Sequence, residues 1–192
     1  MTPGLETPAA DGFQLRRTER LELHALAMEH VGPVHSVYGD PATWSHLPQG
    51  RHATHRATAA MITKAEAGWH EHGLGYWSVL LRAPLAGCSL RPGDIIGTGG
   101  VSVVDGDVWN LGYRLTPEVW GRGLAGEVVS EALACALAVA PDRPVVARIL
   151  SENTASRRVV ERAGLVLLRE ETDRSGPAVG RRRLIFSDRQ VP

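Results

Sequence analysis

The sequence predicts a single α/β domain built on a mixed sheet. Three observations lead to this fold class: alternating apolar patterns typical of strands, apolar residues at helical spacing, and turn residues between these segments. The chain has 192 residues, of which 43% are hydrophobic, enough for one well-buried core. We expect residues 1–12 to form a flexible tail and residues 13–190 to form the domain.

The N-terminal part predicts a strand, an interrupted helix and a turn-rich loop. Residues 13–26 alternate in their second half and indicate one strand. Residues 27–40 indicate a helix that Gly32 and Pro33 break or kink. Turn residues dominate the next segment, 41–50.

The middle of the chain predicts a second helix and two strands. Apolar side chains recur every four residues over 52–73, and Gly73 can end this helix. Strands follow at 75–82 and 94–104, separated by a long loop at 83–93.

The segment after these strands predicts a hairpin turn at Asp-Gly-Asp, 105–107, and a strand at 108–115. One face of this strand carries Trp109, Leu111, Tyr113 and Leu115. The opposite face carries Asn110, Gly112, Arg114 and Thr116.

The C-terminal third alternates between helices and strands. A helix runs to about Ala140, where Pro141 stops it, and a second, capped helix covers 153–164. The predicted strands of this part are 143–150, 165–171 and 181–188.

Charge and composition exclude several classes of protein. The formal net charge is zero, with 21 basic and 21 acidic residues, which removes the electrostatic case for a nucleic-acid or membrane-surface partner. No apolar run approaches the length of a bilayer span, and the first residues lack the features of a signal peptide. Cys88 and Cys135 are therefore expected to be reduced thiols in a cytoplasmic protein.

Glycines crowd the start of the helix that follows residue 120. Gly121, Gly123 and Gly126 match the spacing of a dinucleotide-binding fingerprint, a weak signal on its own. The surrounding sequence does not fit a dinucleotide-binding fold. The preceding strand alternates instead of being wholly apolar, and five residues, 116–120, separate this strand from the first glycine. The expected acidic residue is also misplaced, since Asp142 stands before the next strand.

A pyrophosphate cradle is a second interpretation of the same glycines. Backbone N–H groups at a helix N-terminus lack partners, and the helix dipole favours an anion there. Residues 120–126 suit a diphosphate, with Arg122 available for a further phosphate. From the residues alone, a loop whose glycines only turn the chain is an equally good interpretation.

Two stretches carry a family resemblance. "LGYRLTPEVWGRGLAGEVVSEAL" followed by "ARILSENTASRRVVERAGL" resembles the GNAT superfamily of N-acetyltransferases, in particular its ribosomal-protein N-terminal acetyltransferase branch. The family loop, Gln/Arg-x-x-Gly-x-Gly/Ala, corresponds to 120–125, with Trp120 in place of the first polar residue. The second signature, Asn-x-x-Ser before a helix, falls on Asn153 and Ser156.

The resemblance implies a fold and an activity. The fold is a GNAT-like mixed, mostly antiparallel sheet flanked by helices, with central parallel strands at 108–115 and 143–150 that splay apart. The activity is transfer of an acetyl group from acetyl-coenzyme A to a primary amine by direct attack in a ternary complex. The acceptor is either a protein N-terminus or a small-molecule amine. A non-catalytic acyl-coenzyme A-binding regulatory module is the alternative, and both a monomer and a homodimer are compatible with the sequence.

The resemblance also implies site residues. A backbone N–H near Leu115 would polarise the thioester carbonyl, and the Ser156 hydroxyl would protonate the leaving thiolate. The full set expected to contact acetyl-coenzyme A is Leu115, Thr116, Trp120, Gly121, Arg122, Gly123, Leu124, Ala125, Gly126, Asn153 and Ser156.

The general base and the acceptor site are less defined. Relatives place a glutamate on the strand corresponding to 108–115, which lacks one here, so Asp107, His72 or a water relay are the candidates. The acceptor is expected against the loop 38–51, where Trp44 offers an apolar wall and His46 a proton acceptor. Trp44 could equally cap the core.

No metal site is expected. The histidine pairs His52/His55 and His70/His72 lack the i, i+4 spacing that places two ligands on one helical face, and no cysteine cluster supports them.

Overall fold

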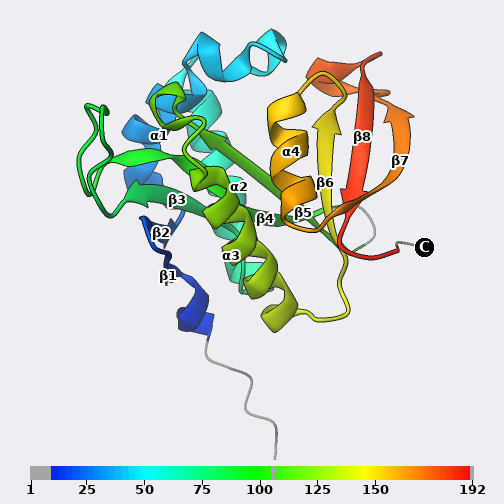
Figure 1. Ribbon diagram of the computed structural model, residues 1–192, viewed down its shortest axis with the longest axis horizontal. Coiled ribbons are helices and arrows are strands. Elements are labelled where there is room, and N and C mark those ends of the chain that lie inside the picture. Colours follow the sequence, from blue (N-terminus) through cyan, green and yellow to red (C-terminus); the bar gives the residue numbers. More distant parts are fainter. Residues whose placement is uncertain (1–9, 105–106, 191–192) are drawn as a thin grey trace, which may run out of the picture.

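The computed structural model describes residues 10–104 and 107–190 as a mixed α/β domain (Figure 1). These residues form one eight-stranded sheet with the order β1-β2-β3-β4-β5-β6-β8-β7. The predicted N-terminal tail lies largely outside the described residues, and Ala10–Phe13 form a short 3-10 helix, η1.

The strands are β1 Leu15–Arg17, β2 Leu21–Ala25, β3 Tyr76–Leu81, β4 Ile95–Val104, β5 Val108–Leu115, β6 Val145–Leu150, β7 Val166–Thr172 and β8 Arg182–Ser187. The α-helices are α1 Val31–Tyr38, α2 His55–His72, α3 Leu124–Val139 and α4 Thr154–Arg162. Short 3-10 helices, η2 to η6, lie at Met28–His30, Pro41–Trp44, Pro48–Gly50, Pro117–Val119 and Gly176–Ala178. None of the helices in the described ranges combines the length and the apolar character that crossing a membrane requires.

The sheet is antiparallel except for the central pair β5 and β6, which run parallel and are joined by the crossover helix α3. Their ladder is short, because only Trp109–Leu111 pairs with Val145–Ala147 although both strands continue further. Beyond Leu111 and Ala147 the two strands diverge (Figure 1). The predicted mixed sheet with splayed central strands is therefore confirmed.

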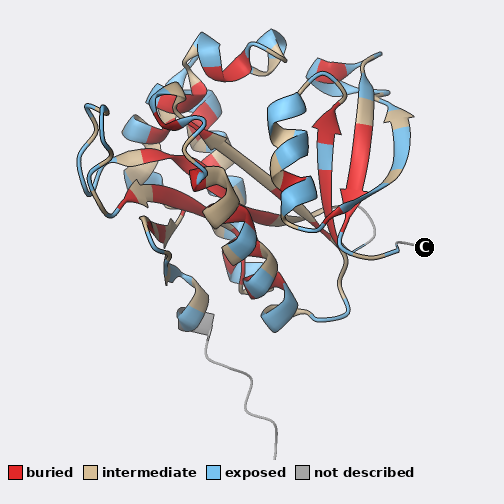
Figure 2. Ribbon diagram, viewed as in Figure 1, coloured by how far each residue is buried: buried red, intermediate tan, exposed pale blue. Residues whose placement is uncertain are grey.

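Helices cover both faces of the sheet. α3 packs on β4 and β5, and α4 packs on β6, whereas α1 and α2 contact β4 from the opposite face (Figure 1). The main core is centred on Trp77, Trp109 and Phe186, all buried. A smaller core lies beneath α1 and α2 and includes Tyr38 and Trp44. Figure 2 shows the buried side of α3 turned to the sheet and the largely exposed outer surface of α4.

Two N-terminal predictions were wrong in detail. The single strand expected at 13–26 is a hairpin, in which β1 turns through Thr18 and pairs antiparallel with β2. The predicted break at Gly32 and Pro33 does not occur, because Pro33 lies in the first turn of α1. A proline there removes an N–H that has no helical partner in any case.

The turn residues around α2 and β5 agree with the sequence where they are described. Gly73 ends α2 in the left-handed conformation, with φ 67°. Of the predicted hairpin turn at 105–107, Asp105 and Gly106 lie outside the described residues, and Asp107 has φ 64°.

A polar clamp fastens the first turn of α3 to the β1–β2 hairpin. Glu127 accepts hydrogen bonds from the hydroxyl of Thr18 and from the backbone N–H of Arg20, the latter at 3.1 Å. The Arg20 guanidinium adds an ion pair with Nε–Oε1 2.5 Å. Because Glu127 is only 17% exposed, its carboxylate depends on these donors to replace water.

Glu127→Gln should lower the free energy of unfolding by about 1–3 kcal/mol near neutral pH, the range for hydrogen bonds to a charged group. Burial would raise the pKa of Glu127, but the bonds from Thr18 and Arg20 outweigh it and hold the pKa below the usual 4.5. A depressed pKa gives stability that is complete above about pH 4.5 and lost as pH falls through the folded-state pKa. Urea unfolding across this range measures the difference between wild type and variant.

The matched control is Glu19→Gln, which neutralises an exposed carboxylate in the same turn and should change stability little at any pH. A gap between wild type and Glu127→Gln that stays constant as the pH falls would contradict the clamp's dependence on the ionised carboxylate.

Candidate active site

The glycine loop before α3 forms a cradle of backbone donors. Gly121 and Gly123 adopt φ 73° and 80°, values that favour glycine, and Leu124 begins the helix. In the described part of the chain, the N–H groups of residues 121–125 donate to no backbone acceptor, whereas Gly126 already bonds the Gly123 carbonyl at 3.0 Å. Consecutive free donors at the positive end of a helix fit a diphosphate.

Two arginines hold this cradle in place. The Arg20 guanidinium donates to the Arg122 carbonyl at 2.8 Å, and Arg122 itself donates to the Ala86 carbonyl at 2.7 Å. A side chain at Gly123 would bring its Cβ to 3.3 Å from Arg20 Nη2. The loop is thus fixed before any ligand arrives, and Arg122, expected to serve a further phosphate, also ties the loop to residues 83–93.

The end of β5 presents different backbone groups to its two neighbours. The Thr116 N–H donates to Ile96 of β4 at 2.8 Å, so it is not available to a thioester carbonyl. Successive N–H groups of a strand point to opposite edges. The Leu115 N–H therefore faces β6, at a point where the β5–β6 ladder has already ended. Trp120, 51% exposed, crosses this edge and donates its indole N–H to the Leu115 carbonyl at 2.8 Å.

The other wall is the N-terminus of α4. Asn153 caps the helix, its side chain accepting from the Ser156 N–H at 3.1 Å. The Tyr113 hydroxyl donates to the Ser156 carbonyl at 3.3 Å, which links the end of β5 to α4. Burial raises the pKa of Tyr113 to about 12, with the Ser156 bond acting against it, so the phenol keeps its proton at neutral pH.

A cavity of about 180 Å³ lies where β5 and β6 diverge. From the α3/α4 side of the sheet, Tyr113, Ser156 and Val160 line it. From the α1/α2 side it is lined by His46, Leu47, Gly112, Arg114, Arg148 and Arg183. Because strand residues alternate between faces, a cavity with lining from both sides passes through the sheet.

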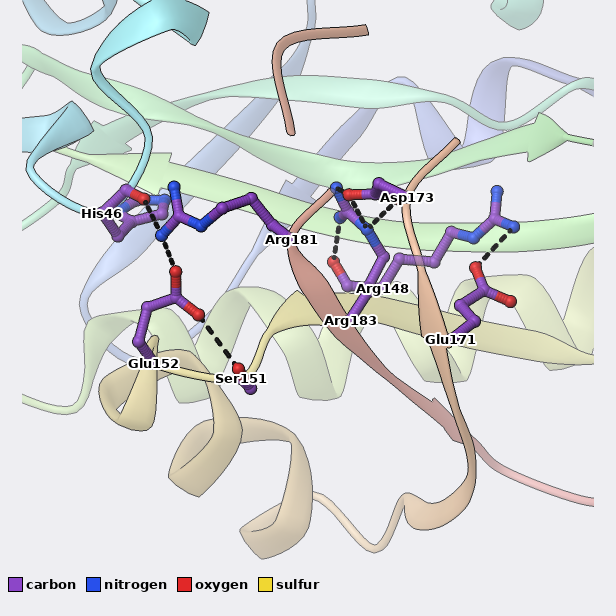
Figure 3. Close-up of polar contacts among 8 residues, drawn as sticks. All are labelled: His46, Arg148, Ser151, Glu152, Glu171, Asp173, Arg181 and Arg183. Atoms are coloured by element: carbon purple, nitrogen blue, oxygen red, sulfur yellow. Dashed lines mark hydrogen bonds and ion pairs between the residues drawn. The ribbon is translucent and has the colours of Figure 1, made fainter. Parts of the chain in front are cut away.

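His46 is one of the two predicted acceptor residues, and the structure brings it to this cavity with Ser156. Burial, and secondarily the charges of Arg114 and Arg181, hold the pKa of His46 below 6.5. The loop that carries it is anchored by Arg181, which donates to the His46 carbonyl at 3.3 Å and pairs with Glu152 (Figure 3). A neutral imidazole can accept a proton.

Trp44, the other predicted acceptor residue, is part of the smaller core. It is 8% exposed, its indole N–H donates to the Tyr38 carbonyl at 2.6 Å, and the cavity lining does not include it. The Arg114 guanidinium stacks on its ring at 3.4 Å from the centroid. The core-capping interpretation of Trp44 is the one that this geometry favours.

Asp107, the candidate base, lies at the other end of β5. It precedes Val108 and pairs with Arg143 at 2.5 Å, eight residues before Leu115. At the rise of a strand this separation is about 26 Å. The structure therefore does not bring Asp107 together with Ser156, and His72 lies against Trp109 near the same distant end.

A larger cavity of about 850 Å³ adjoins the first one on the α1/α2 side. Both cavities are lined by Arg148 and Arg183. Arg183 pairs with Asp173 at 2.6 Å and Arg148 with Glu171 at 3.4 Å, as Figure 3 shows. On the α1/α2 side the opening in the sheet is therefore bordered by a wall of paired charges.

Three site residues were not singled out from the sequence. Tyr113 and Arg114 were assigned to opposite faces of β5 correctly, but no role followed for either. Arg181 lies far from His46 in the sequence, so no local pattern connects them. The described residues contain no cluster of three or more histidine, cysteine, aspartate or glutamate side chains that could hold a metal ion.

Comparisons with known proteins identify the family and the fold. The family model described as an acetyltransferase (GNAT) domain matches residues 20–166. An acetyltransferase from Agrobacterium tumefaciens str. C58 is 25% identical with a TM-score of 0.72, covering 92% of this chain and 94% of the other.

Two more distant structures share the fold. The ribosomal-protein-S5-alanine acetyltransferase from Vibrio fischeri is 16% identical, with a TM-score of 0.70 and coverage of 90% of this chain and 94% of the other. The microcin C7 self-immunity acetyltransferase MccE, in complex with acetyl-CoA and AMP, is 12% identical, with a TM-score of 0.68 and coverage of 88% and 92%. With its family match spanning most of the domain, the chain belongs to the GNAT acetyltransferase family.

Proposed function

We propose that this acetyltransferase moves the acetyl group of acetyl-coenzyme A to a primary amine by direct attack, with both substrates bound at once. The observation that carries the proposal is the cavity through the sheet, which joins the Ser156 side to the His46 side. An amine entering from the His46 side would reach a thioester held on the Ser156 side. Holding the two reactants in contact lowers the barrier by removing the entropic cost of their encounter.

The chain's own groups fit acetyl-coenzyme A. The N–H groups of residues 121–125 would hold the pyrophosphate, and the Leu115 N–H, on the edge of β5 where the ladder to β6 has ended, would hydrogen-bond the pantetheine. When bound, acetyl-coenzyme A supplies an activated thioester. The complex of a solved relative with acetyl-CoA supports the same choice of donor.

Gly123→Asp should abolish the stabilisation that acetyl-coenzyme A gives to the wild type. A ligand at about 100 times its Kd stabilises the native state by roughly 2.7 kcal/mol. The aspartate would place bulk against Arg20 and negative charge against the pyrophosphate. Thermal unfolding with and without the ligand measures the shift.

The matched control is Gly73→Asp, which strains a glycine of similar φ, 67°, at the C-terminus of α2. Both variants should lose stability, but only Gly73→Asp should keep the ligand-induced shift. An unchanged shift in Gly123→Asp would place the diphosphate elsewhere.

His46 would take the proton of the acceptor ammonium. Its lowered pKa keeps it neutral at physiological pH, and it lines the opening from the acceptor side. His46→Gln should reduce kcat/KM for the acceptor by about 10- to 100-fold while leaving acetyl-coenzyme A affinity unchanged. Steady-state kinetics with the acceptor varied, and calorimetry with acetyl-coenzyme A, measure the two effects separately.

The pH dependence of this effect distinguishes a base from a packing residue. The acceptor's own protonation affects both proteins equally, so the ratio of wild-type to variant activity isolates His46. This ratio should stay constant above pH 6.5 and fall only below it, as His46 becomes protonated. A ratio that does not change with pH would mean that His46 only shapes the site.

Ser156 and Tyr113 both offer a hydroxyl on the thioester side, and we propose that Ser156 protonates the departing thiolate. Ser156→Ala should then lower kcat by about 100-fold with little change in KM for acetyl-coenzyme A. Tyr113→Phe is the matched comparison, since it removes a hydroxyl already bonded to the Ser156 carbonyl. A larger loss of kcat in Tyr113→Phe than in Ser156→Ala would reassign the proton donor to the tyrosine.

A further inference from the structure

Arg114 is a partly buried cation with no carboxylate partner in the described parts of the chain. It extends from β5 to the α1/α2 side, where its guanidinium stacks on Trp44 at 3.4 Å and lies 5.5 Å from the Tyr38 ring centroid. Its one hydrogen bond among the described residues goes to the Thr43 carbonyl. Burial lowers the pKa of Arg114, and the two nearby phenols, of Tyr38 and Tyr76, act in the opposite direction.

The arrangement leaves the guanidinium without an anionic partner among the described residues, and its one hydrogen bond there is to a backbone carbonyl. A guanidinium has five N–H donors, and buried charges in proteins are as a rule paired. The cation–π contact with Trp44 offsets part of the cost but supplies no hydrogen-bond acceptor in the plane of the guanidinium. The remaining polar neighbours, His46 and His52, supply no negative charge, and burial first and Arg114 next lower their pKa values.

Other arginines around the same opening are neutralised within the chain. Arg183 pairs with Asp173, Arg148 with Glu171, and Arg181 with Glu152 (Figure 3). No aspartate or glutamate is among the residues that line the 180 Å³ cavity in the described structure. Arg114 therefore brings net positive charge to the place where the two substrates meet.

Acetyl-coenzyme A does not account for this charge. Its charged groups are phosphates, which the loop at 121–125 would hold on the α3 side of the sheet, and its pantetheine arm is uncharged. The group that faces Arg114 would then belong to the acceptor, which enters from the same face. A carboxylate matches a guanidinium through two parallel hydrogen bonds, and this pairing is strong in a site shielded from water.

We infer that the acceptor is an amine that also carries a carboxylate, and that Arg114 binds this carboxylate and thereby selects the substrate. The inference rests on the proposed acetyl transfer and narrows its acceptor to amino acids and to peptides with an acidic side chain near the N-terminus. Polyamines and other amines without an acid group are poor substrates, because they bring positive charge to a site that already has it.

The test compares acceptors in matched pairs that differ only in the charge of one group. Free amino acids are paired with their carboxamides, and Ser-Asp-initiated peptides with Ser-Asn-initiated ones. Because a carboxamide lowers the pKa of the neighbouring amine, kcat/KM is calculated from the concentration of neutral amine. The wild type should prefer the acid of the correct pair by about 10- to 100-fold, the range for a charge-assisted hydrogen bond.

Arg114→Gln should bring this acid-to-amide ratio close to one, whereas Arg17→Gln, at an exposed arginine of β1, should keep the wild-type ratio. Both rates in the ratio are measured on the same protein. A smaller folded fraction of Arg114→Gln would lower both rates equally and leave the ratio unaffected. A role in stabilising charge on the thioester oxygen would lower activity toward acid and amide equally and leave the ratio unchanged. That result, or a wild type without acid preference, would overturn the inference.

A binding measurement tests the same claim without turnover. With coenzyme A present, N-acetyl amino acids should raise the melting temperature of the wild type more than their carboxamides do. Absence of transfer to every amine would refute the proposed function, while equal shifts from acids and carboxamides would refute the role of Arg114. The free amino acids and the acidic peptides, run as separate arms, identify which source supplies the carboxylate.

Discussion

The early end of the β5–β6 ladder is the constraint on which the rest of the site depends. The last parallel pair joins Leu111 to Ala147, and the next residues of β5 are held by opposite sides of the molecule. Tyr113 is bonded to the first turn of α4, and Arg114 is bonded to the Thr43 carbonyl beneath α1. Beyond that pair β5 no longer bonds β6, and among the described residues the Leu115 N–H has no backbone partner, while its carbonyl accepts from the Trp120 indole.

The crossover connection then determines which face of the sheet carries the glycine loop. Strand β5 leads through a few residues into α3, so the N-terminus of that helix lies at the same end of the sheet as the opening. The clamp of Glu127 to Arg20 and the bond from Arg20 to Arg122 hold this helix start in position. The unpartnered backbone donors of residues 121–125 thereby lie on the α3 side, while His46 and Arg114 line the opening from the α1/α2 side.

Much of this arrangement could be predicted from the sequence, because local patterns determine it. Alternation in 108–115 gave the correct faces of β5, and the glycines at 121–126 indicated an unpartnered helix start. The β1–β2 hairpin was missed because its turn at Thr18–Arg20 contains no glycine or proline. The anchoring of His46 by Arg181 could not be predicted, since the two residues meet only after β8 has joined β6. Asp107 is a different case: the length of β5 alone already places it far from the opening.

Trp44 connects the stability of the fold to the chemistry of the opening. The sequence suggested that Trp44 is either an apolar wall for the acceptor or a cap on the core. In the structure the indole packs as a core residue and stacks on Arg114, which lines the cavity. A partly buried guanidinium without an anionic partner is unfavourable, and stacking of Arg114 on the indole offsets part of that cost. The side chains are thus arranged in two layers, an outer one in which Arg114 lines the cavity and an inner one that supports Arg114. The inner layer, of Trp44 and Tyr38, holds Arg114 in an orientation it could not keep in water, because a free arginine samples many rotamers.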